Sequence, residues 1–106
     1  MFDEAEFHKV ADAFIAYLAD TIEEADEDAL LECEVAGGVL TIESETKKTW
    51  VVSKHAPSKQ IWLASPFSGG LHFSYEQNAW KLPDGRELAN ILAAELNTHA
   101  GVEVAL

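Results

Sequence analysis

The chain has 106 residues, of which 48% are hydrophobic and 25% charged, and its formal net charge is −12. These values predict one globular domain, residues 1–106, rather than a disordered or fibrous chain. The acid excess argues against a nucleic-acid partner, because phosphate contacts need clustered lysine and arginine. No apolar run approaches the roughly 20 residues needed to cross a bilayer, and the acidic start is unlike a secretion signal. We therefore expect a soluble, cytoplasmic protein with no membrane partner.

An amphipathic helix is predicted over about residues 3–24. The apolar residues from position 7 onward recur at intervals of three and four, which is the period of a helix with one buried face. They are Phe7, Val10, Ala11, Phe14, Ile15, Leu18 and Ile22. The opposite face carries polar residues at steps of four, and the stretch EADEDA after the helix is predicted to be a polar linker.

The next stretch, LLECEVAGGVLTIESE, changes to a period of two, which predicts a β-hairpin turning at AGG. Leu31, Cys33 and Val35 face one side of the first strand, and Glu32 and Glu34 face the other. Four short apolar segments follow with brief turns between them, and this spacing favours antiparallel pairing. They are TWVVSKH, KQIWLAS, GLHFSY and AWKL.

A second helix is predicted to begin at the N-cap Asp84, with Glu87 three residues on, and to end near Gly101. The tail VEVAL is apolar enough to pack on the domain. The order helix, five or six strands, helix predicts an α+β two-layer sandwich with both helices on one face of an antiparallel sheet. The other face of the sheet must then be partly open to water.

The charge is concentrated near the start of the chain: 14 of the 19 acids, but one of the seven lysine and arginine residues, lie within residues 1–46. Asp20, Glu23 and Glu24 would lie beside Glu32 and Glu34 if the first strand neighbours the helix. His8, between Glu4 and Asp12 at steps of four, offers a mixed nitrogen and oxygen site. The metal candidates are Glu4, His8, Asp12, Asp20, Glu23, Glu24, Asp26, Asp28, Glu32 and Glu34.

Such sites would be shallow and weak, because no closed ligand cage is recognisable in the sequence. The alternative interpretation is that these acids form an ordinary solvated face that keeps the protein soluble. His8 is equally compatible with a surface residue that has no role. Both alternatives stay open from the sequence alone.

Trp62 is predicted to face outward, because Ile61 and Leu63 on either side of it are expected to face the helices. An exposed tryptophan is a candidate interface anchor. The alternative is a Trp62 partly covered by Val51 and Ser53 of the adjoining strand. Trp50 and Trp80 are expected to pack in the core or against the sheet. Cys33, the only cysteine, is predicted to be a small buried residue, and no catalytic arrangement is recognisable.

The sequence resembles the frataxin family, and within it the bacterial CyaY branch. The resemblance rests on EFHKVAD, CEVAGGVLTI, KQIWLASPFSGGLHF, NAWKL and LANILAAEL, and it extends over about residues 4–98. It implies a non-enzymatic protein that binds iron (Fe2+ or Fe3+) weakly, with other divalent cations as alternatives. It also implies docking on the cysteine desulfurase and the scaffold protein of iron-sulfur cluster assembly.

Combined with the acidic stretch, the resemblance suggests that the desulfurase meets Glu23, Glu24, Glu32 and Glu34. It implies that the scaffold meets the strand face of Ser53, His55, Gln60 and Trp62, with His72 as a further candidate. The protein would be mainly a monomer, with an iron-dependent oligomer as a second state. Two other functions stay open: an iron-oxidising storage oligomer, and an acidic interaction module that needs no metal.

Overall fold

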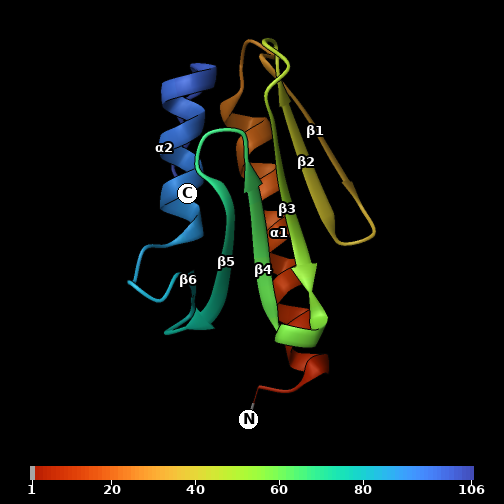
Figure 1. Ribbon diagram of the computed structural model, residues 1–106. Helices are drawn as coiled ribbons and strands as arrows, with labels where there is room; N and C mark the ends of the chain where they lie inside the picture. Colours follow the sequence, from red (N-terminus) through yellow and green to blue (C-terminus); the bar gives the residue numbers. More distant parts are fainter. Residues whose placement is uncertain (1) are drawn as a thin grey trace.

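The computed structural model describes residues 2–106 and consists of two helices and a six-stranded sheet (Figure 1). Helix α1 spans Glu4–Ala25, within one residue of the predicted bounds. Its N-cap is Asp3, whose carboxylate accepts a hydrogen bond of 2.8 Å from the backbone N–H of Glu6. This bond satisfies one of the N–H groups that a helix leaves without an internal partner.

The six strands form one antiparallel sheet in which sequence neighbours are also spatial neighbours, so the order is β1 to β6. The short turns between the strands allow only this kind of pairing, as the sequence predicted. The strands are β1 (Leu31–Ala36), β2 (Val39–Ser44), β3 (Thr49–His55), β4 (Gln60–Ser65), β5 (Gly69–Glu76) and β6 (Ala79–Lys81). A short 3-10 turn, η1 (Ala56–Ser58), joins β3 to β4.

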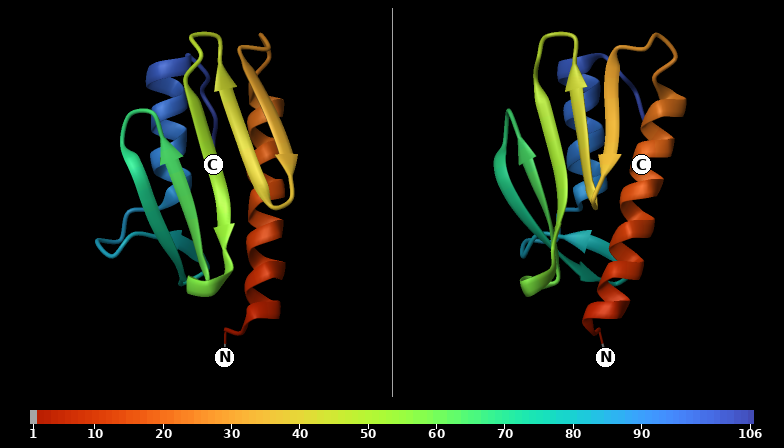
Figure 2. Two further views of the ribbon diagram at one scale, coloured as in Figure 1. Left: turned by 45° about the vertical axis from the view of Figure 1, so that its right-hand side comes forward. Right: turned by 90° about the vertical axis from the view of Figure 1, so that its right-hand side faces the viewer.

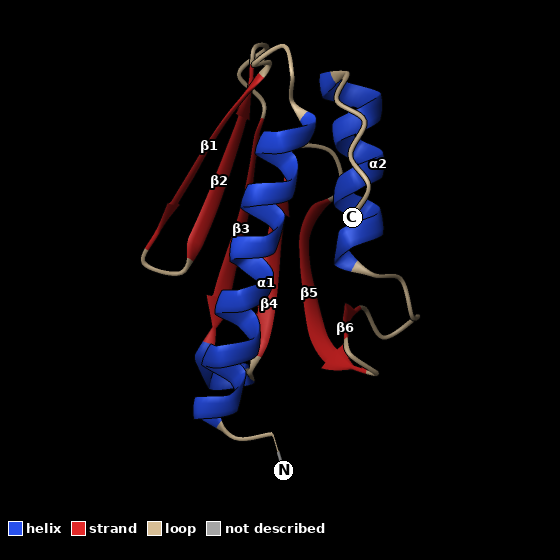
Figure 3. Cartoon of the chain, turned by 180° about the vertical axis from the view of Figure 1, so that it is seen from behind, coloured by secondary structure: helices blue, strands red, loops and turns tan. Residues whose placement is uncertain are grey.

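Both helices lie on the same face of the sheet, which confirms the predicted two-layer sandwich (Figure 3). The two side views show that the other face carries no helix (Figure 2). The core between the layers contains Phe7 and Leu18 of α1, Trp50 of β3, and Leu92 of α2 (Leu88–Ala100), all fully buried. Trp80 is also in the core at 2% exposure, so both tryptophans predicted to be interior are interior.

The predicted start of the second helix was wrong. Helix α2 begins at Leu88, and its N-cap is Glu87 rather than Asp84. Asp84 instead accepts a hydrogen bond of 3.0 Å from the backbone N–H of Arg86 within the preceding turn. After this turn Glu87 forms an isolated bridge to Lys81 of β6, so the helix begins later than the capping pattern suggested.

The last residues pack back on the domain, as their composition predicted. The helix ends at Gly101, whose φ of 72° lies in the left-handed region that glycine adopts without strain. Val102 beyond it is buried, and Val104 and Leu106 pack against the core. Within residues 2–106, neither helix combines the length and apolar character that a membrane span requires.

Candidate metal- and partner-binding surface

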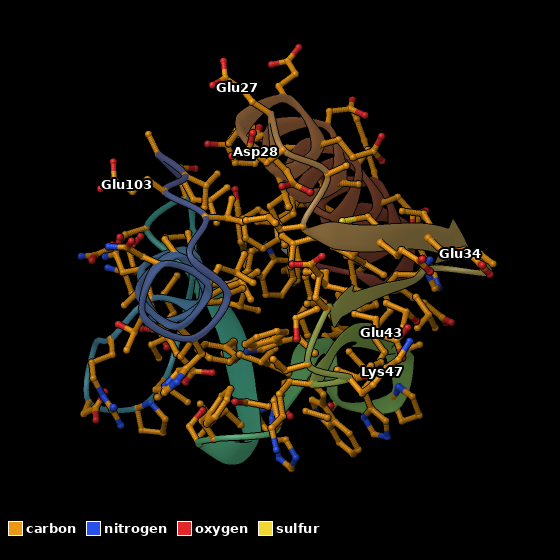
Figure 4. All side chains as sticks on the ribbon, turned by 90° about the horizontal axis from the view of Figure 1, so that it is seen from above. Glu27, Asp28, Glu34, Glu43, Lys47 and Glu103 are labelled. Atoms are coloured by element: carbon orange, nitrogen blue, oxygen red, sulfur yellow. The ribbon has the colours of Figure 1, made fainter. Side chains whose placement is uncertain are left out.

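The C-terminal end of α1 and the loop after it form the most acidic part of the molecule. Glu23, Glu24, Glu27 and Asp28 are all exposed. Among the described residues, no lysine, arginine or histidine lies within ion-pair distance of any of these four carboxylates. Figure 4 shows Glu27 and Asp28 projecting from this end of the molecule. Their negative charge is therefore available to cations in solution.

Glu32 and Glu34 lie on the edge strand β1, but they face away from α1. Their neighbours Leu31 and Cys33 are buried and half-buried, whereas both glutamates are exposed. Glu32 is paired in register with Glu43 of β2, so two carboxylates face each other across the strands. Such like-charged pairs oppose sheet formation. The strand is next to the helix, as expected, yet it separates the acids of α1 from its own acids rather than gathering them.

A shallow hollow of about 310 Å³ lies over these strands on the helix-free face, and its lining includes Glu32, Glu34 and Glu43. Lys47 is the one cation within ion-pair distance of these three among the described residues, at 4.0 Å from Glu43. Figure 4 shows Glu34, Glu43 and Lys47 along this side. The acids of α1 and of the strands lie on opposite sides of β1 but border the same edge of the sheet. We refer to Asp20, Glu23, Glu24, Glu27, Asp28, Glu32, Glu34 and Glu43 as the acidic edge.

Asp26 belongs to the same stretch but has a structural role. Its two carboxylate oxygens accept hydrogen bonds of 2.8 Å each from the backbone N–H groups of Leu30 and Leu31. The side chain thus fixes the path of the chain from α1 into β1. A carboxylate with both oxygens engaged in this way is a poorer metal ligand than its exposed neighbours.

Cys33 lies on the side of β1 that faces α1 and is half-buried. Burial, and after it the nearby carboxylates of Glu23 and Asp26, together raise the pKa of its thiol to about 11. The thiol is therefore protonated at neutral pH and is a weak nucleophile. Cys33 thus packs against the core, as the sequence predicted, but it is half-buried rather than buried.

The predicted mixed site at the other end of α1 already contains a cation. His8 Nε2 lies 3.6 Å from Glu4 Oε1. The ammonium of Lys54 from β3 lies 2.7 Å from Asp12 Oδ1 and 3.1 Å from His8 Nδ1. Lys54 is largely buried, with 18% of its side chain exposed. We refer to Glu4, His8, Asp12 and Lys54 as the Lys54 cluster.

Sequence reasoning missed Lys54, although a signal was present. Trp50 and Val52 on the same strand face the helices, and Lys54 has the same parity. A lysine that points under a helix needs an anionic partner, and the acids of α1 supply one. Gly38 in the β1–β2 turn fits the same arrangement, since a Cβ there would lie 2.5 Å from Cε of Lys54.

The described residues contain no group of three or more histidine, cysteine or carboxylate side chains arranged to hold a metal ion. The individual metal ligands proposed from the sequence thus stay predictions. The arrangement suits loosely held cations on an extended anionic surface, because hard cations accept carboxylate oxygens even where water completes their coordination.

Trp62 lies on the helix-free face of the sheet, as the alternation predicted, because Ile61 and Leu63 beside it are buried. It is half-buried: the rings of His55 and His72 stack on it with centroids 3.8 and 4.1 Å away. The two histidines thus cover its ring on both sides, and Ser53 of β3 lies directly opposite it in the strand register.

Hydrogen bonds hold this aromatic group in place. The indole N–H of Trp62 donates to the Gln60 side-chain oxygen at 3.1 Å, and the Gln60 amide reaches Ser74 Oγ at 3.3 Å. His55 Nδ1 lies 2.6 Å from Ser58 Oγ. Thr49 of β3 shares this sheet face with Glu32, Glu43 and Ser53, so the acids and the tryptophan belong to one continuous surface.

Residues 1–102 match the family model of the frataxin-like domain. The chain belongs to the frataxin family. It is 35% identical over 105 residues to the iron-sulfur cluster assembly protein CyaY of Photobacterium profundum, covering 98% of this chain and 97% of that protein. It is 38% identical over 94 residues to the mitochondrial frataxin homolog of Saccharomyces cerevisiae, covering 85% of this chain and 54% of the yeast protein.

Solved frataxin structures have the same fold. The frataxin of Psychromonas ingrahamii superposes with a TM-score of 0.86 at 26% identity, covering 96% of this chain and 95% of that one. A trimeric yeast frataxin complexed with ferrous iron superposes with a TM-score of 0.77 at 34% identity, covering 87% of this chain and 86% of that one. The family resemblance noted in the sequence is thus confirmed, as is the frataxin fold.

Proposed function

We propose that this frataxin is a non-enzymatic protein of iron-sulfur cluster assembly that binds iron loosely along the acidic edge. The observation that carries the proposal is the set of exposed carboxylates without lysine or arginine partners at the end of α1 and on β1. Two relatives add to it, because one is named for iron-sulfur cluster assembly and the other is a frataxin complexed with ferrous iron.

The same surface would dock on the cysteine desulfurase through a basic patch of that enzyme. Complementary charge accelerates association and selects the partner. Iron and the desulfurase would then compete for Glu23, Glu24, Glu32 and Glu34. The scaffold protein would meet the neighbouring sheet face, where Trp62 is held in a fixed orientation by its two histidines and can act as a rigid aromatic anchor.

Charge-reversal variants test the docking proposal. In a variant carrying lysine at Glu23, Glu24, Glu32 and Glu34, desulfurase binding measured by calorimetry should be abolished. The double variant Glu32→Lys/Glu34→Lys should weaken it strongly. Its control is Glu6→Lys/Glu76→Lys, which makes the same change in net charge at exposed positions outside the acidic edge. Equal loss of binding in the two double variants would show that net charge alone matters and would overturn the docking proposal.

Trp62→Ala separates the two contacts. Desulfurase binding should be unchanged, whereas affinity for the complex that also contains the scaffold should fall by about tenfold or more, as expected for loss of an aromatic anchor. Phe67→Ala is the control, because Phe67 is an exposed aromatic residue in the β4–β5 turn. An equal effect of the two substitutions on the ternary complex would contradict a specific role for Trp62.

A ferrous titration followed by amide NMR distinguishes the proposal from its alternatives. Loose binding predicts gradual line broadening on the acidic edge. A protein that oxidises and stores iron would consume oxygen and form large particles, and an acidic module without metal function would show no local broadening. The monomer should persist at low iron, and sedimentation at rising iron would reveal an oligomer comparable to the trimeric yeast protein.

A further inference from the structure

The two outermost strands of the sheet differ in how their unpaired sides are protected. At one margin, β6 has only three residues, and Lys81 at its end forms a bridge to Glu87. At the other margin, β1 has six residues, contains no proline or lysine, and pairs with β2 in an unbroken register. Short length, proline, lysine and bulges are the usual protection of an outermost strand, because its unpaired groups can bind another strand. Figures 1 and 3 show β1 at the margin of the sheet with no segment beyond it.

The turn between β1 and β2 determines which main-chain groups of β1 point outward. It consists of two glycines, residues 37–38, with φ of 58° and 76°, and the residues that flank such a two-residue hairpin turn form a hydrogen-bonded pair. Hydrogen-bonded and non-hydrogen-bonded pairs alternate along an antiparallel ladder. Glu32 and Glu34 therefore bond to β2, whereas the N–H and C=O groups of Cys33 and Val35 point away from it.

These outward groups lie open within the part of the chain that the structure describes. The N–H of Leu31 already donates to Asp26 at 2.8 Å, so the open stretch begins after Leu31. Outside the sheet, no hydrogen bond among residues 2–106 involves the main chain of Cys33 or Val35. The last three residues of β1 are exposed, and Val35 is one of the few large apolar residues at the surface, with 48% exposure. Main chain and side chains at this end of β1 can thus meet another strand.

The glutamates of β1 determine what kind of strand fits. Toward a strand added outside β1, Glu32 and Glu34 occupy non-hydrogen-bonded positions, where facing side chains are closest. Glu43 lies opposite Glu32 on β2 and extends the negative charge across the sheet. A second copy of β1 would place its own glutamates against these, because antiparallel pairing keeps each parity on one face. Basic side chains at the same positions would be attracted.

From these observations we propose that β1 accepts an extended basic segment of a partner protein as a seventh, antiparallel strand of the sheet. Lysine or arginine residues of that segment lie opposite Glu32 and Glu34, and apolar residues lie opposite Cys33 and Val35. Main-chain hydrogen bonds supply affinity, and the glutamates select the partner. The site shares two glutamates with the proposed docking surface but needs neither iron nor the desulfurase, so its test does not depend on the proposed function.

The probe is the capped peptide Thr-Val-Lys-Val-Lys-Thr, whose valines lie opposite Val35 and Cys33 and whose lysines lie opposite Glu34 and Glu32. Amide hydrogen exchange of the full chain, followed by NMR, reads out the pairing. Without peptide, the N–H groups of Cys33 and Val35 should exchange much faster than those of Glu32 and Glu34. With saturating peptide, exchange at Cys33 and Val35 should slow by about tenfold or more, because both groups become hydrogen-bonded.

Two methylated peptides separate main-chain pairing from simple charge attraction. Methyl groups on both valine nitrogens remove the N–H groups that face β1, and this peptide should bind at least about tenfold more weakly. Methyl groups on both lysine nitrogens of the main chain remove N–H groups that point away from β1, and this peptide is the matched control, with nearly unchanged affinity. The charge and composition of the two peptides are identical.

Two variants of the protein test the same geometry from the other side. Val35→Pro removes an outward N–H without removing a bond to β2, and it should weaken the peptide several-fold. Val35→Thr keeps the N–H and is its control. Glu32→Gln/Glu34→Gln should also weaken the peptide and remove most of the dependence of its affinity on salt. If Val35→Pro fails to fold, the two methylated peptides still decide the matter.

Three results would overturn the proposal. One is unchanged exchange at Cys33 and Val35 up to the solubility limit of the peptide. Another is equal binding of the two methylated peptides, which would mean that charge alone holds the segment. The third is slow exchange at Cys33 and Val35 without peptide that increases with protein concentration, because the added strand would then come from a second copy of this chain.

Discussion

The two ends of helix α1 carry similar densities of acid but manage them in opposite ways. At the N-terminal end, the Lys54 cluster brings a largely buried ammonium to 2.7 Å from Asp12 and 3.1 Å from His8. At the C-terminal end, the acidic edge has Lys47, 4.0 Å from Glu43, as its one cation among the described residues. A candidate ligand set is therefore defined by the basic side chains that reach it as much as by the acids themselves.

Under the proposed function, this difference favours one end of α1 over the other as the place for iron. A metal ion at Glu4, His8 and Asp12 would have to displace Lys54, a fixed positive charge in a poorly solvated place. A metal ion at the acidic edge meets no such competitor and relieves repulsion between carboxylates such as Glu32 and Glu43, which face each other. We therefore rank the acidic edge above the Lys54 cluster as the iron-binding surface.

The largest expected effect separates a structural acid from its free neighbours. Asp26→Ala removes the acceptor of two backbone N–H groups, those of Leu30 and Leu31, and should lower the free energy of unfolding by about 2–3 kcal/mol. Asp28→Ala, two residues on and exposed, is the control and should change it by less than about 0.5 kcal/mol. Urea denaturation of the two variants measures the difference, and similar costs would mean that the Asp26 bonds are not important for stability.

The second effect tests the internal cation directly. Lys54→Met keeps the apolar stem but removes the ammonium, so we expect a loss of about 1–2 kcal/mol, since the pair is partly exposed. Cobalt(II), a paramagnetic substitute for Fe2+, should then bind near His8 at least about tenfold more tightly than in the unaltered protein.

Lys48→Met is the control for this experiment, because Lys48 is exposed and none of the ion pairs among residues 2–106 includes it. The double variant Asp12→Asn/Lys54→Met completes a cycle that isolates the energy of the pair. If cobalt(II) already broadens the His8 signals of the unaltered protein as strongly as those of Lys54→Met, the lysine does not exclude metal.

Much of the fold could be predicted from the sequence, because periodicity records which side chains are buried. The alternation around Ile61 and Leu63 correctly placed Trp62 outside, and the steps of three and four along α1 predicted its bounds to one residue. The capping pattern failed where another local contact competed: Glu87 is bridged to Lys81, and α2 begins only after it despite the capping signal at Asp84.

The candidate site was less predictable, because it depends on which residues each acidic side chain contacts in the folded protein. The sequence showed which residues are acidic, but not that Asp26 turns inward to cap the chain or that Glu32 faces Glu43. Pairing of Lys54 with Asp12 joins positions 42 residues apart, a separation that no local pattern encodes. The stacking of His55 and His72 on Trp62 likewise depends on strand register.

The third effect, the screening of charge, tests whether the acidic edge is repulsive where the Lys54 cluster is not. Added salt or millimolar Mg2+ should raise the melting temperature by several degrees, because relief of about 1 kcal/mol of repulsion has that effect in a domain of this size. A variant with glutamine at Glu23, Glu24, Glu32 and Glu34 should start from a higher melting temperature and respond less. An identical response to salt in both proteins would place the repulsion elsewhere.

The smallest effect concerns Glu95, a carboxylate that is satisfied by neutral donors rather than left exposed like the acidic edge. It accepts hydrogen bonds from Trp50 Nε1 at 2.9 Å and from the hydroxyls of Ser65 and Ser68 at 2.5 and 2.8 Å. Burial acts to raise the pKa of Glu95, but the bonds from Ser65, Trp50 and Ser68 outweigh it and hold the pKa below its usual value of 4.5.

Because the pKa of Glu95 is lower in the folded protein, its contribution to stability is fully present above pH 4.5 and is lost as the pH falls through the lowered value. Glu95→Gln should therefore flatten the acid side of the stability profile, measured by urea denaturation between about pH 3 and pH 7, whereas Glu24→Gln should leave its slope nearly unchanged. If Glu95→Gln loses stability on acidification as steeply as the unaltered protein, carboxylates other than Glu95 govern the acid response.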